Sequence, residues 1–402
     1  MLRKRTLSAV FVVAAALALT LCATSTAFAA VSPGDVCAVL VDGTTANDEG
    51  YATFDDALGN VGDGGTIYLL ADATYGGPGD FTPPNYGATS LTFDLRGYDL
   101  SMGMYGISLD GSSLTILNGG TVSAFDIDLI FGGSLVADAN FNLDDALWVQ
   151  HDSTVTITGN IQAVDYGAEV DTGGVLYLTG NVTVDDGTGV AVEDGGTATV
   201  EGNIDAYYAL FVYGSSLTVT GDVKSEIYCL SENNSTLILD GDLTVSGDAT
   251  PGILATDSST ATVNGNITMT GSGSFGAGVG DDGQVTVKGV ITAPNYVVFG
   301  SLDYYDDFIP TTIKTPGQND PTSLLSGFNQ YSFANGTATA YVWVLPLSNT
   351  EGTSGGLPSG TAADLIPGTG DGTPAAGLAA LVAAALSGIA LVLLKRLRSS
   401  QR

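Results

Sequence analysis

Three carboxylates in the middle of the chain have a spacing that acid–base chemistry on a sugar could use. Asp165 and Asp186 fall at equivalent positions of two successive repeats, and Glu226 lies near the same position two repeats later. Two carboxyl groups at a suitable separation are sufficient for glycoside hydrolysis. The chain carries 43 Asp and Glu residues, however, so solvated turn carboxylates would give the same coincidence. We therefore expect no catalytic residue and keep a glycoside hydrolase as the alternative.

The sequence holds few of the residues from which metal and cofactor sites are built. His151 is the one histidine, and there is no Cys-x-x-Cys pair, so the usual zinc and haem ligand sets are excluded. The acidic pairs Asp144-Asp145, Asp185-Asp186 and Asp281-Asp282 lack the spacing of an EF-hand loop. We expect no metal site and no cofactor, with weak calcium binding as the most these pairs could provide.

A different chemistry, in which the chain itself is cut, is indicated near the C-terminus. The relevant pentapeptide consists of Ile366, Pro367, Gly368, Thr369 and Gly370. Pro367 favours an extended backbone at Ile366, and the two glycines add no bulk. A peptide that a membrane-bound transpeptidase cuts must be extended in this way. The pentapeptide can therefore take this extended form, and the resemblance described below implies that it is the cleavage site.

The residues after the pentapeptide predict a membrane-crossing helix. Residues 375–394 form an uncharged apolar run of 20 residues, which is about the length that a helix needs to cross a hydrocarbon core. Lys395, Arg396 and Arg398 follow directly, and such a basic cluster lies naturally on the cytoplasmic side. Everything N-terminal to the run is then expected outside the cell.

This order of motif, apolar run and basic tail resembles the cell-wall sorting signal of Gram-positive surface proteins. In that family a sortase cuts an LPxTG-type motif between Thr and Gly, here Thr369 and Gly370, and the resemblance implies sortase and peptidoglycan as partners. Ile366 stands where the family usually has Leu, which leaves the sortase class open. Residues 357–361 look similar but have Gly and Thr in the wrong order. The alternatives are a plain single-pass membrane anchor and, less well supported, a GPI-type signal.

The N-terminal segment agrees with export. Residues 1–29 have a basic start, an apolar stretch and a small-residue exit ending at Ala29, the pattern of a secretory signal peptide. Leu21 before Cys22 argues against a lipoprotein. We therefore expect an extracellular protein attached to the cell wall, which meets the membrane only through its signal peptide and C-terminal helix.

The segment between the two signals is strongly acidic. Residues 30–369 hold 42 acidic residues, and their net formal charge is −38. Such a field repels polyanions, which makes nucleic acid, acidic lipid headgroups and polyuronates poor partners. Apolar residues recur throughout, so the chain can bury a core. The four cations of this segment are Arg96, Lys224, Lys288 and Lys314.

A repeat of about twenty residues runs from about Ser90 to Ser301. Its marker is an alternating strand that ends in Gly-Asn or Gly-Asp, and six marker glycines are spaced 21, 22, 19, 20 and 24 residues apart, from Gly159 to Gly265. Each unit holds about three short strands and no helix-length period. Glycine before Asn or Asp suits a corner where φ becomes positive. The pattern predicts an all-β fold, a right-handed parallel β-helix of about ten coils and roughly 50 Å.

The ends of such a rod must be covered, because open sheet edges recruit other chains. Residues 51–58 predict a short helix with Thr53 as its N-cap, and Thr66 to Leu70 enters the first coil. The expected organisation is a signal peptide (1–29), an N-terminal cap (30–75), the β-helix (76–302), a C-terminal cap (303–347), a Gly/Ser/Thr linker (348–365) and the sorting signal (366–402).

The N-terminal cap resembles the opening of many pectate-lyase-like β-helix proteins. The resemblance rests on Tyr51-x-Thr53-Phe54-x-x-Ala57-Leu58 followed by Gly-Asp-Gly-Gly-Thr-Ile at residues 62–67. It implies polysaccharide lyase or hydrolase activity as a possibility. Lyases need a strong base and usually calcium, but no two of the coil cations share a site. The Gly-His-Gly and Arg-x-Lys elements of the polygalacturonase-type hydrolases are also absent.

The repeat assigns faces to the third strand of each coil. The inward positions are Leu147, Val149, Ala168, Val170, Val190, Val192, Leu210, Val212, Cys229, Ile253 and Ala255. The outward positions are Trp148, Gln150, Glu169, Asp171, Ala191, Glu193, Phe211, Tyr213, Leu230 and Glu232. Because Cys229 points inward, we expect Cys37 and Cys229 to be separate small hydrophobes, although export permits a disulfide.

The outward face of the third strand provides the ligand-binding candidates. Exposed aromatic rings beside hydrogen-bond acceptors suit sugar rings, and packing of these rings beneath a loop is the alternative. The candidates are Trp148, Phe211, Tyr213, Glu169, Asp171 and Glu193. The function we expect is an anchored structural or adhesive rod without catalysis, which contacts a host or environmental glycan or protein. The alternative is a glycan-binding or glycan-degrading module.

Overall fold

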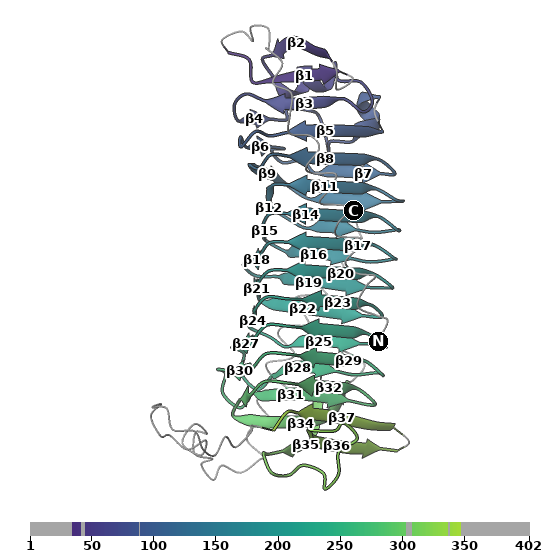
Figure 1. Ribbon diagram of the computed structural model, residues 1–402, viewed down its shortest axis with the longest axis vertical. Helices are drawn as coiled ribbons and strands as arrows, with labels where there is room; N and C mark the ends of the chain where they lie inside the picture. The colour runs from purple at the N-terminus through teal and green to yellow at the C-terminus, as the bar shows by residue number, and fades with distance from the viewer. Residues whose placement is uncertain (1–33, 42–44, 88, 303–307, 337, 347–402) are drawn as a thin grey trace.

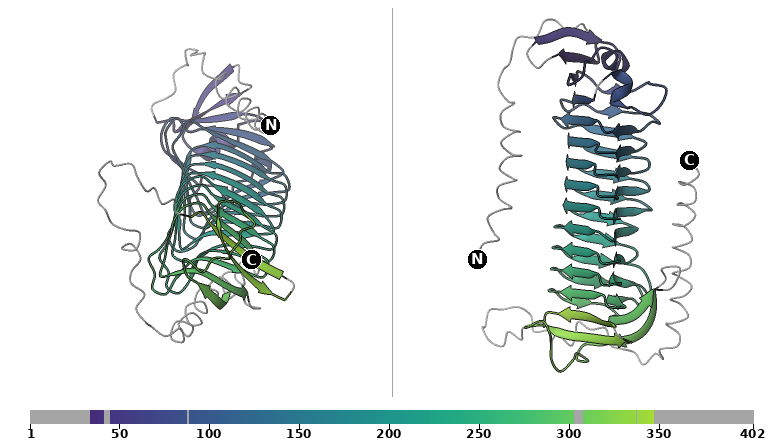
Figure 2. Two further views of the ribbon diagram at one scale, coloured as in Figure 1. Left: turned by 60° about the horizontal axis from the view of Figure 1, so that its bottom comes forward. Right: turned by 90° about the vertical axis from the view of Figure 1, so that its right-hand side faces the viewer.

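The computed structural model describes residues 34–41, 45–87, 89–302, 308–336 and 338–346. The expected signal peptide, linker, sorting motif and apolar run lie outside these residues. The described residues form a parallel β-helix of the right-handed type with about ten coils, as the repeat predicts (Figure 1). Seen from the side, the coils stack as parallel rungs between two caps (Figure 2).

Each coil contributes one strand to each of three sheets, here named sheet A, sheet B and sheet C. Successive coil strands of a sheet come from successive coils and pair in parallel, whereas the strands at the ends pair antiparallel: β1 with β2 and β3, β34 with β35, and β36 with β37. In spatial order, sheet A contains β2 (Thr45–Tyr51), β1 (Cys37–Val41), β3 (Thr66–Leu69), β5 (Ser90–Asp94), β8 (Ser113–Leu117), β11 (Ser134–Asp138), β14 (Thr154–Thr158), β17 (Val175–Thr179), β20 (Thr197–Glu201), β23 (Ser216–Val219), β26 (Thr236–Leu239), β29 (Thr260–Val263), β32 (Gln284–Val287), β37 (Ala338–Val344) and β36 (Asn329–Asn335).

Sheet B has the shortest strands and sheet C includes the candidate third strands. Sheet B contains β4 (Ala73–Thr74), β6 (Leu100–Ser101), β9 (Thr121–Ala124), β12 (Asn140–Leu143), β15 (Ile161–Ala163), β18 (Val182–Val184), β21 (Ile204–Ala206), β24 (Val223–Ser225), β27 (Leu243–Val245), β30 (Ile267–Met269) and β33 (Ile291–Thr292). Sheet C contains β7 (Ile107–Asp110), β10 (Ile127–Ile130), β13 (Leu147–Val149), β16 (Tyr166–Val170), β19 (Thr188–Glu193), β22 (Tyr208–Tyr213), β25 (Cys229–Glu232), β28 (Pro251–Ala255), β31 (Phe275–Gly280), β34 (Asn295–Leu302) and β35 (Phe308–Lys314).

The core is a stack of aliphatic side chains that point inward from all three sheets. In β14, Val155 and Ile157 are buried while the threonines between them are exposed. All of the side chains expected to point inward from the third strands are buried. Cys37 and Cys229 are also buried and free, and burial raises the pKa of each thiol to about 12. Both cysteines therefore behave as small hydrophobes.

The corner between sheets A and B explains why the repeat marker begins with glycine. A Cβ on Gly180 would overlap the carbonyl oxygen of Gly159 in the preceding coil, and one on Gly221 would overlap that of Gly202. Gly202, Gly221 and the later marker glycines do not have positive φ. The expectation that positive φ requires these glycines is therefore wrong in most coils. The close approach of one coil to the next excludes a side chain there.

The Asn or Asp after each marker glycine ties neighbouring coils together. The Oδ1 of Asn160 accepts a hydrogen bond from the backbone N–H of Asn181 at 2.9 Å, and Asn181 Oδ1 accepts from Asn203 N at 2.8 Å. The same contact repeats coil by coil through Asn203, Asp222, Asp242 and Asn266. We call this series the Asx ladder. Each such bond contributes on the order of 1 kcal/mol.

A short helix at the N-terminal end and a polar network at the other end cover the rod. Helix α2 (Phe54–Leu58) has Thr53 as its N-cap, as expected, and the Thr53 hydroxyl accepts from Asp56 N. A 3-10 turn, η1 (Pro83–Tyr86), follows β4. At the far end β36 pairs antiparallel with β37 and forms the last strand of sheet A.

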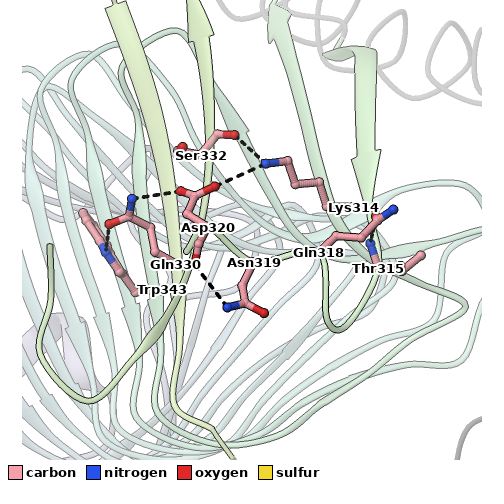
Figure 3. Close-up of polar contacts among 8 residues, drawn as sticks. All are labelled: Lys314, Thr315, Gln318, Asn319, Asp320, Gln330, Ser332 and Trp343. Carbon is pink, nitrogen blue, oxygen red and sulfur yellow. Dashed lines mark hydrogen bonds and ion pairs between the residues drawn. The ribbon is translucent and has the colours of Figure 1, made fainter. Parts of the chain in front are cut away.

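The free edge of β36 is occupied by groups from the preceding loop and strand (Figure 3). Lys314 Nζ donates to the carbonyl of Ser332 at 2.8 Å, and Asp320 N donates to that of Gln330 at 2.7 Å. Lys314 also lies 3.6 Å from the Asp320 carboxylate. The side chain of Gln330 accepts from Trp343 Nε1 and donates to Asp320. These contacts block the edge carbonyls that another strand would use.

Candidate functional site

The outer face of sheet C carries all six ligand-binding candidates. Trp148, Glu169 and Phe211 belong to one column, which also contains Ala191, and Glu193 pairs with Tyr213 in the adjacent column. The six candidate side chains are half-buried. We call this region the aromatic zone, and it consists of Trp148, Tyr166, Glu169, Asp171, Glu193, Phe211 and Tyr213.

Within the aromatic zone, Trp148 packs against a neighbouring ring rather than standing alone. The ring centroids of Trp148 and Tyr166 are 5.7 Å apart, with the planes tilted by 41°. Asp171, in the second column, has one carboxylate oxygen that is buried and has no hydrogen-bond partner among the described residues. A hydroxyl donor at this position would satisfy that oxygen. The zone therefore combines an aromatic wall with an acceptor.

Two of the positions that point outward on this face are buried. Ala191 is 1% exposed and Leu230 is 3% exposed, although the register points both outward. Leu230 belongs to a second hydrophobic cluster, separate from the core, against which Phe211 and Tyr228 pack. We call this cluster the apolar strip, and it consists of Leu230, Leu254, Phe275, Val298 and Phe308. Both positions point outward as the repeat predicts, and Leu230 is nevertheless buried because apolar neighbours in successive coils pack against it.

An open cavity of about 690 Å³ lies at the N-terminal end, where the loop after β4 meets sheet C. Asp80 reaches from that loop and accepts a hydrogen bond from Gly106 N at 2.9 Å. Tyr75 provides an aromatic wall, and its ring lies 6.3 Å from that of Tyr105. The residues that line the cavity are Tyr75, Pro78, Gly79, Asp80, Thr82, Asn85 and Ser108.

Asp126 and Asp128 flank this end of sheet C and differ from ordinary surface acids. Burial raises the pKa of Asp126 to about 6, and the charges of Asp80, Asp145 and Asp128 add to the effect. Burial also raises the pKa of Asp128, while the nearby His151 partly offsets the shift. A carboxyl group that titrates near neutral pH can act as a general acid or base. We call Asp80, Asp110, Asp126 and Asp128 the acidic zone.

The acidic zone was not among the candidate sites predicted from the sequence, although the spacing of Asp126 and Asp128 could have indicated two of its four residues. Asp128 lies in β10 and Asp126 directly precedes this strand, so the two stand around the inward Ile127, and strand alternation puts both on the outer side of sheet C. Asp80 and Tyr75 come from a loop that does not follow the repeat. Its path, and therefore the cavity, could not be derived from repeat spacing.

The structure places the three spaced carboxylates at the corner between sheets B and C. Burial raises the pKa of Tyr207, and the charges of Glu226 and Asp186 contribute, so these two acids lie near one tyrosine. Both are exposed, whereas Asp165 is half-buried and its backbone carbonyl accepts from Thr188 N. The cavity described above is lined by none of the three. Their arrangement agrees with turn carboxylates.

The described residues contain no group of three or more His, Cys, Asp or Glu side chains arranged to hold a metal ion. Within the same ranges no helix is long and apolar enough to cross a membrane, and the apolar run 375–394 lies outside them. No family model, curated protein or solved structure matches this chain. The function is therefore inferred from the sequence signals and from the geometry of the rod.

Proposed function

We propose that this protein is exported, attached to the cell wall through residues 366–370, and displays an acidic β-helical rod as a structural or adhesive element without catalysis. The observation that carries the proposal is the uninterrupted stack of coils and its Asx ladder, placed between two sequence segments that resemble export and sorting signals. Such a stack suits mechanical display, because each coil is fixed to the next by backbone pairing and by side-chain hydrogen bonds.

The anchoring part of the proposal is tested by Thr369→Ala in the full-length chain. We expect this variant to remain in the membrane fraction, while the wild type is released only when the wall is digested. Thr361→Ala changes the similar motif with the wrong residue order and is the matched control. Unchanged covalent attachment of Thr369→Ala to the wall would contradict the proposal. Membrane retention of the wild type as well would favour the single-pass anchor.

A second candidate function, binding or cleavage of a neutral glycan, is favoured by the cavity and its neighbouring acids. Tyr75 and Asp80 line the cavity, and Asp126 beside it titrates near pH 6. The aromatic zone continues the same face with rings and with the unpartnered Asp171 oxygen. Together these features provide aromatic rings on which a sugar ring could stack and oxygen atoms that could accept hydrogen bonds from its hydroxyls, along sheet C.

Glycan-array binding by the full-length chain tests this second function. We expect Trp148→Ala and Tyr213→Ala to abolish binding if the aromatic zone is the site, and Tyr177→Ala on sheet A to leave it unchanged. Cleavage of a bound glycan that Asp126→Asn eliminates would establish catalysis. Absence of both binding and cleavage would leave the non-enzymatic rod as the function.

A further inference from the structure

The outer face of sheet A repeats one surface chemistry through ten coils. The first two outward residues of each strand form two columns that stay in register from β5 to β32. The first column is Ser90, Ser113, Ser134, Thr154, Val175, Thr197, Ser216, Thr236, Thr260 and Gln284. The second column is Thr92, Thr115, Val136, Thr156, Tyr177, Thr199, Thr218, Ile238, Thr262 and Thr286. We call these two columns the hydroxyl face, because 15 of the 20 residues are Ser or Thr.

The hydroxyl face is uncharged in a rod whose net formal charge is strongly negative. None of its 20 residues is Asp, Glu, Lys or Arg, and all 20 are exposed or half-buried. The outer face of sheet C, in contrast, carries Asp110, Asp128, Glu169 and further acids. Sheet B offers about one outward residue per coil and includes the ion pair of Lys224 and Asp205. Acids adjoin the hydroxyl face only at its border, for example Asp138 and Glu201.

In the N-terminal half of the hydroxyl face, two larger side chains protrude into solvent. Tyr177 is 50% exposed and Val136 is 47% exposed. Outward apolar groups on a β-sheet usually gain by covering one another or a partner, and tyrosine is enriched at the centres of protein interfaces. If another surface binds to this neutral face, these two side chains would form the apolar part of the contact.

We propose that the hydroxyl face is the surface through which two copies of this chain associate face to face. Two rods with about −38 charges each repel along sheet C and along the corner acids, but not where both present uncharged columns. Ten coils about 4.8 Å apart and strands of four to five residues give roughly 700 Å² per copy, close to the ~800 Å² per partner of a standard interface. A twofold contact needs only one self-complementary patch, which the identical columns provide.

The contact that this surface makes is weak and hydrated, since hydroxyl groups exchange hydrogen bonds with water at little gain. Its effect grows when many rods on two surfaces meet at once, because linked weak contacts add through effective concentration. This addition of many weak contacts rests on the proposed display at the cell surface. The association of two copies does not, so either proposal can fail while the other holds.

Cysteine cross-linking of the full-length chain in mild detergent tests the interface. Thr199→Cys places one thiol near the centre of the hydroxyl face, and Thr183→Cys places one on sheet B in the neighbouring coil as the matched control. The native Cys37 and Cys229 are buried and give little background. With a short bis-maleimide we expect at least a tenfold higher dimer yield for Thr199→Cys. Adding Tyr177→Glu to that variant should reduce the yield severalfold.

Circular dichroism should confirm that each variant keeps the β-sheet spectrum of the wild type. Salt provides an independent readout: it screens the repulsion between acidic faces, so the dimer yield should rise with ionic strength. Equal cross-linking of Thr199→Cys and Thr183→Cys would overturn the proposal. So would a dimer yield that Tyr177→Glu leaves unchanged, or a chain that stays monomeric at every salt concentration.

Discussion

The outer faces of sheet A and sheet C are built by the same register and carry opposite surface chemistry. On the hydroxyl face of sheet A most coils repeat hydroxyl side chains and none carries a charge, whereas on sheet C successive coils vary from acids to aromatic rings to the apolar strip. In a parallel stack each outward residue lies about 4.8 Å from its equivalents in the next coils. A residue type that recurs in every coil therefore repeats its charge or polarity along the whole rod.

This difference shows what stacking does to charge. Like charges directly opposite each other in a sheet are destabilising, and on sheet C burial raises the pKa of Asp126 while the nearby charges of Asp80, Asp145 and Asp128 add to the shift. The hydroxyl face of sheet A avoids that cost with neutral side chains. A face that varies from coil to coil can form a localised site, whereas a uniform face suits contact with another repetitive surface.

The largest effect should come from breaking the coil register on which both faces depend. In Gly221→Ala the new Cβ overlaps the backbone of Gly202, and the preceding coil cannot move without disturbing the Asx ladder. We expect a loss of about 2–3 kcal/mol, as for overpacked sites. Denaturant unfolding measures it. Gly62→Ala, whose Cβ would meet nothing within 4 Å, is the control and should change stability little.

The pH dependence of stability distinguishes the acidic zone from the hydroxyl face. The pKa of Asp126 is raised from 3.8 to about 6 in the folded protein, so folding takes up a proton between these values. Its contribution therefore rises as pH falls from above 6 towards 4. A shift of about two units would correspond to about 3 kcal/mol for a fully buried group. Solvent screening of this half-exposed carboxyl leaves about 1 kcal/mol.

Asp126→Asn should remove this contribution, so the variant should be about 1 kcal/mol more stable than the wild type at pH 7 and gain less on acidification. Thermal melts at pH 4.5 and pH 7.5 measure the difference. Asp144→Asn, an exposed acid near the same corner, is the charge-matched control. If both variants shift stability equally, general repulsion rather than the local environment of Asp126 is responsible.

Removal of a charge should destabilise the protein more in the polar network at the edge of β36 than on the side of the rod. Lys314→Met removes the donor to the Ser332 carbonyl and leaves Asp320 without its cation, at an expected cost of about 1–2 kcal/mol. Lys224→Met removes an exposed ion pair with Asp205 and should cost less than about 0.5 kcal/mol. Hydrogen exchange should show faster opening of β36 in Lys314→Met alone. Equal protection of β36 in both variants would mean that the network does not close the edge.

The smallest effect concerns the two acids within the Asx ladder. Asp222 and Asp242 occupy successive coils, and each Oδ1 accepts from the backbone N–H of the next ladder residue. Asp222→Asn keeps the acceptor and removes the repulsion with Asp242, so we expect a gain of a few tenths of a kcal/mol. Asn203→Asp is the reverse change, because it places a second charge next to Asp222, and it should lose a similar amount. Stabilisation by both changes would show that charge in this column is not the deciding factor.

The sequence was sufficient to predict the architecture because the coil repeats the same alternation about ten times. Leu147, Val170 and Cys229 were placed inward from spacing alone, and Thr53 was recognised as a helix cap. The reason for the marker glycines was wrong, because the backbone of the adjacent coil, rather than φ, excludes a side chain there. Spacing within one coil does not reveal how closely the next coil approaches.

The candidate site could be predicted from the sequence less completely than the fold. Trp148 and Tyr213 were placed on the correct face, but the burial of Ala191 and Leu230 depends on how neighbouring side chains fill the surface. The cavity depends on a loop that carries Tyr75 and Asp80 to sheet C from outside the repeat. The repeat determines whether each of its residues points inward or outward. The position of a loop residue depends instead on the path of the loop in the folded protein, which local sequence patterns do not encode.

Sedimentation velocity of the full-length chain at low and high salt tests most directly the claim that the rod has a neutral contact face and a repulsive acidic face. We expect dimer to increase with salt for the wild type and for Thr183→Glu on sheet B. Thr199→Glu, which places a charge in the hydroxyl face, should remain monomeric at low salt and associate at least severalfold less at high salt. Equal association of the two glutamate variants, or wild-type association that weakens with salt, would contradict the account.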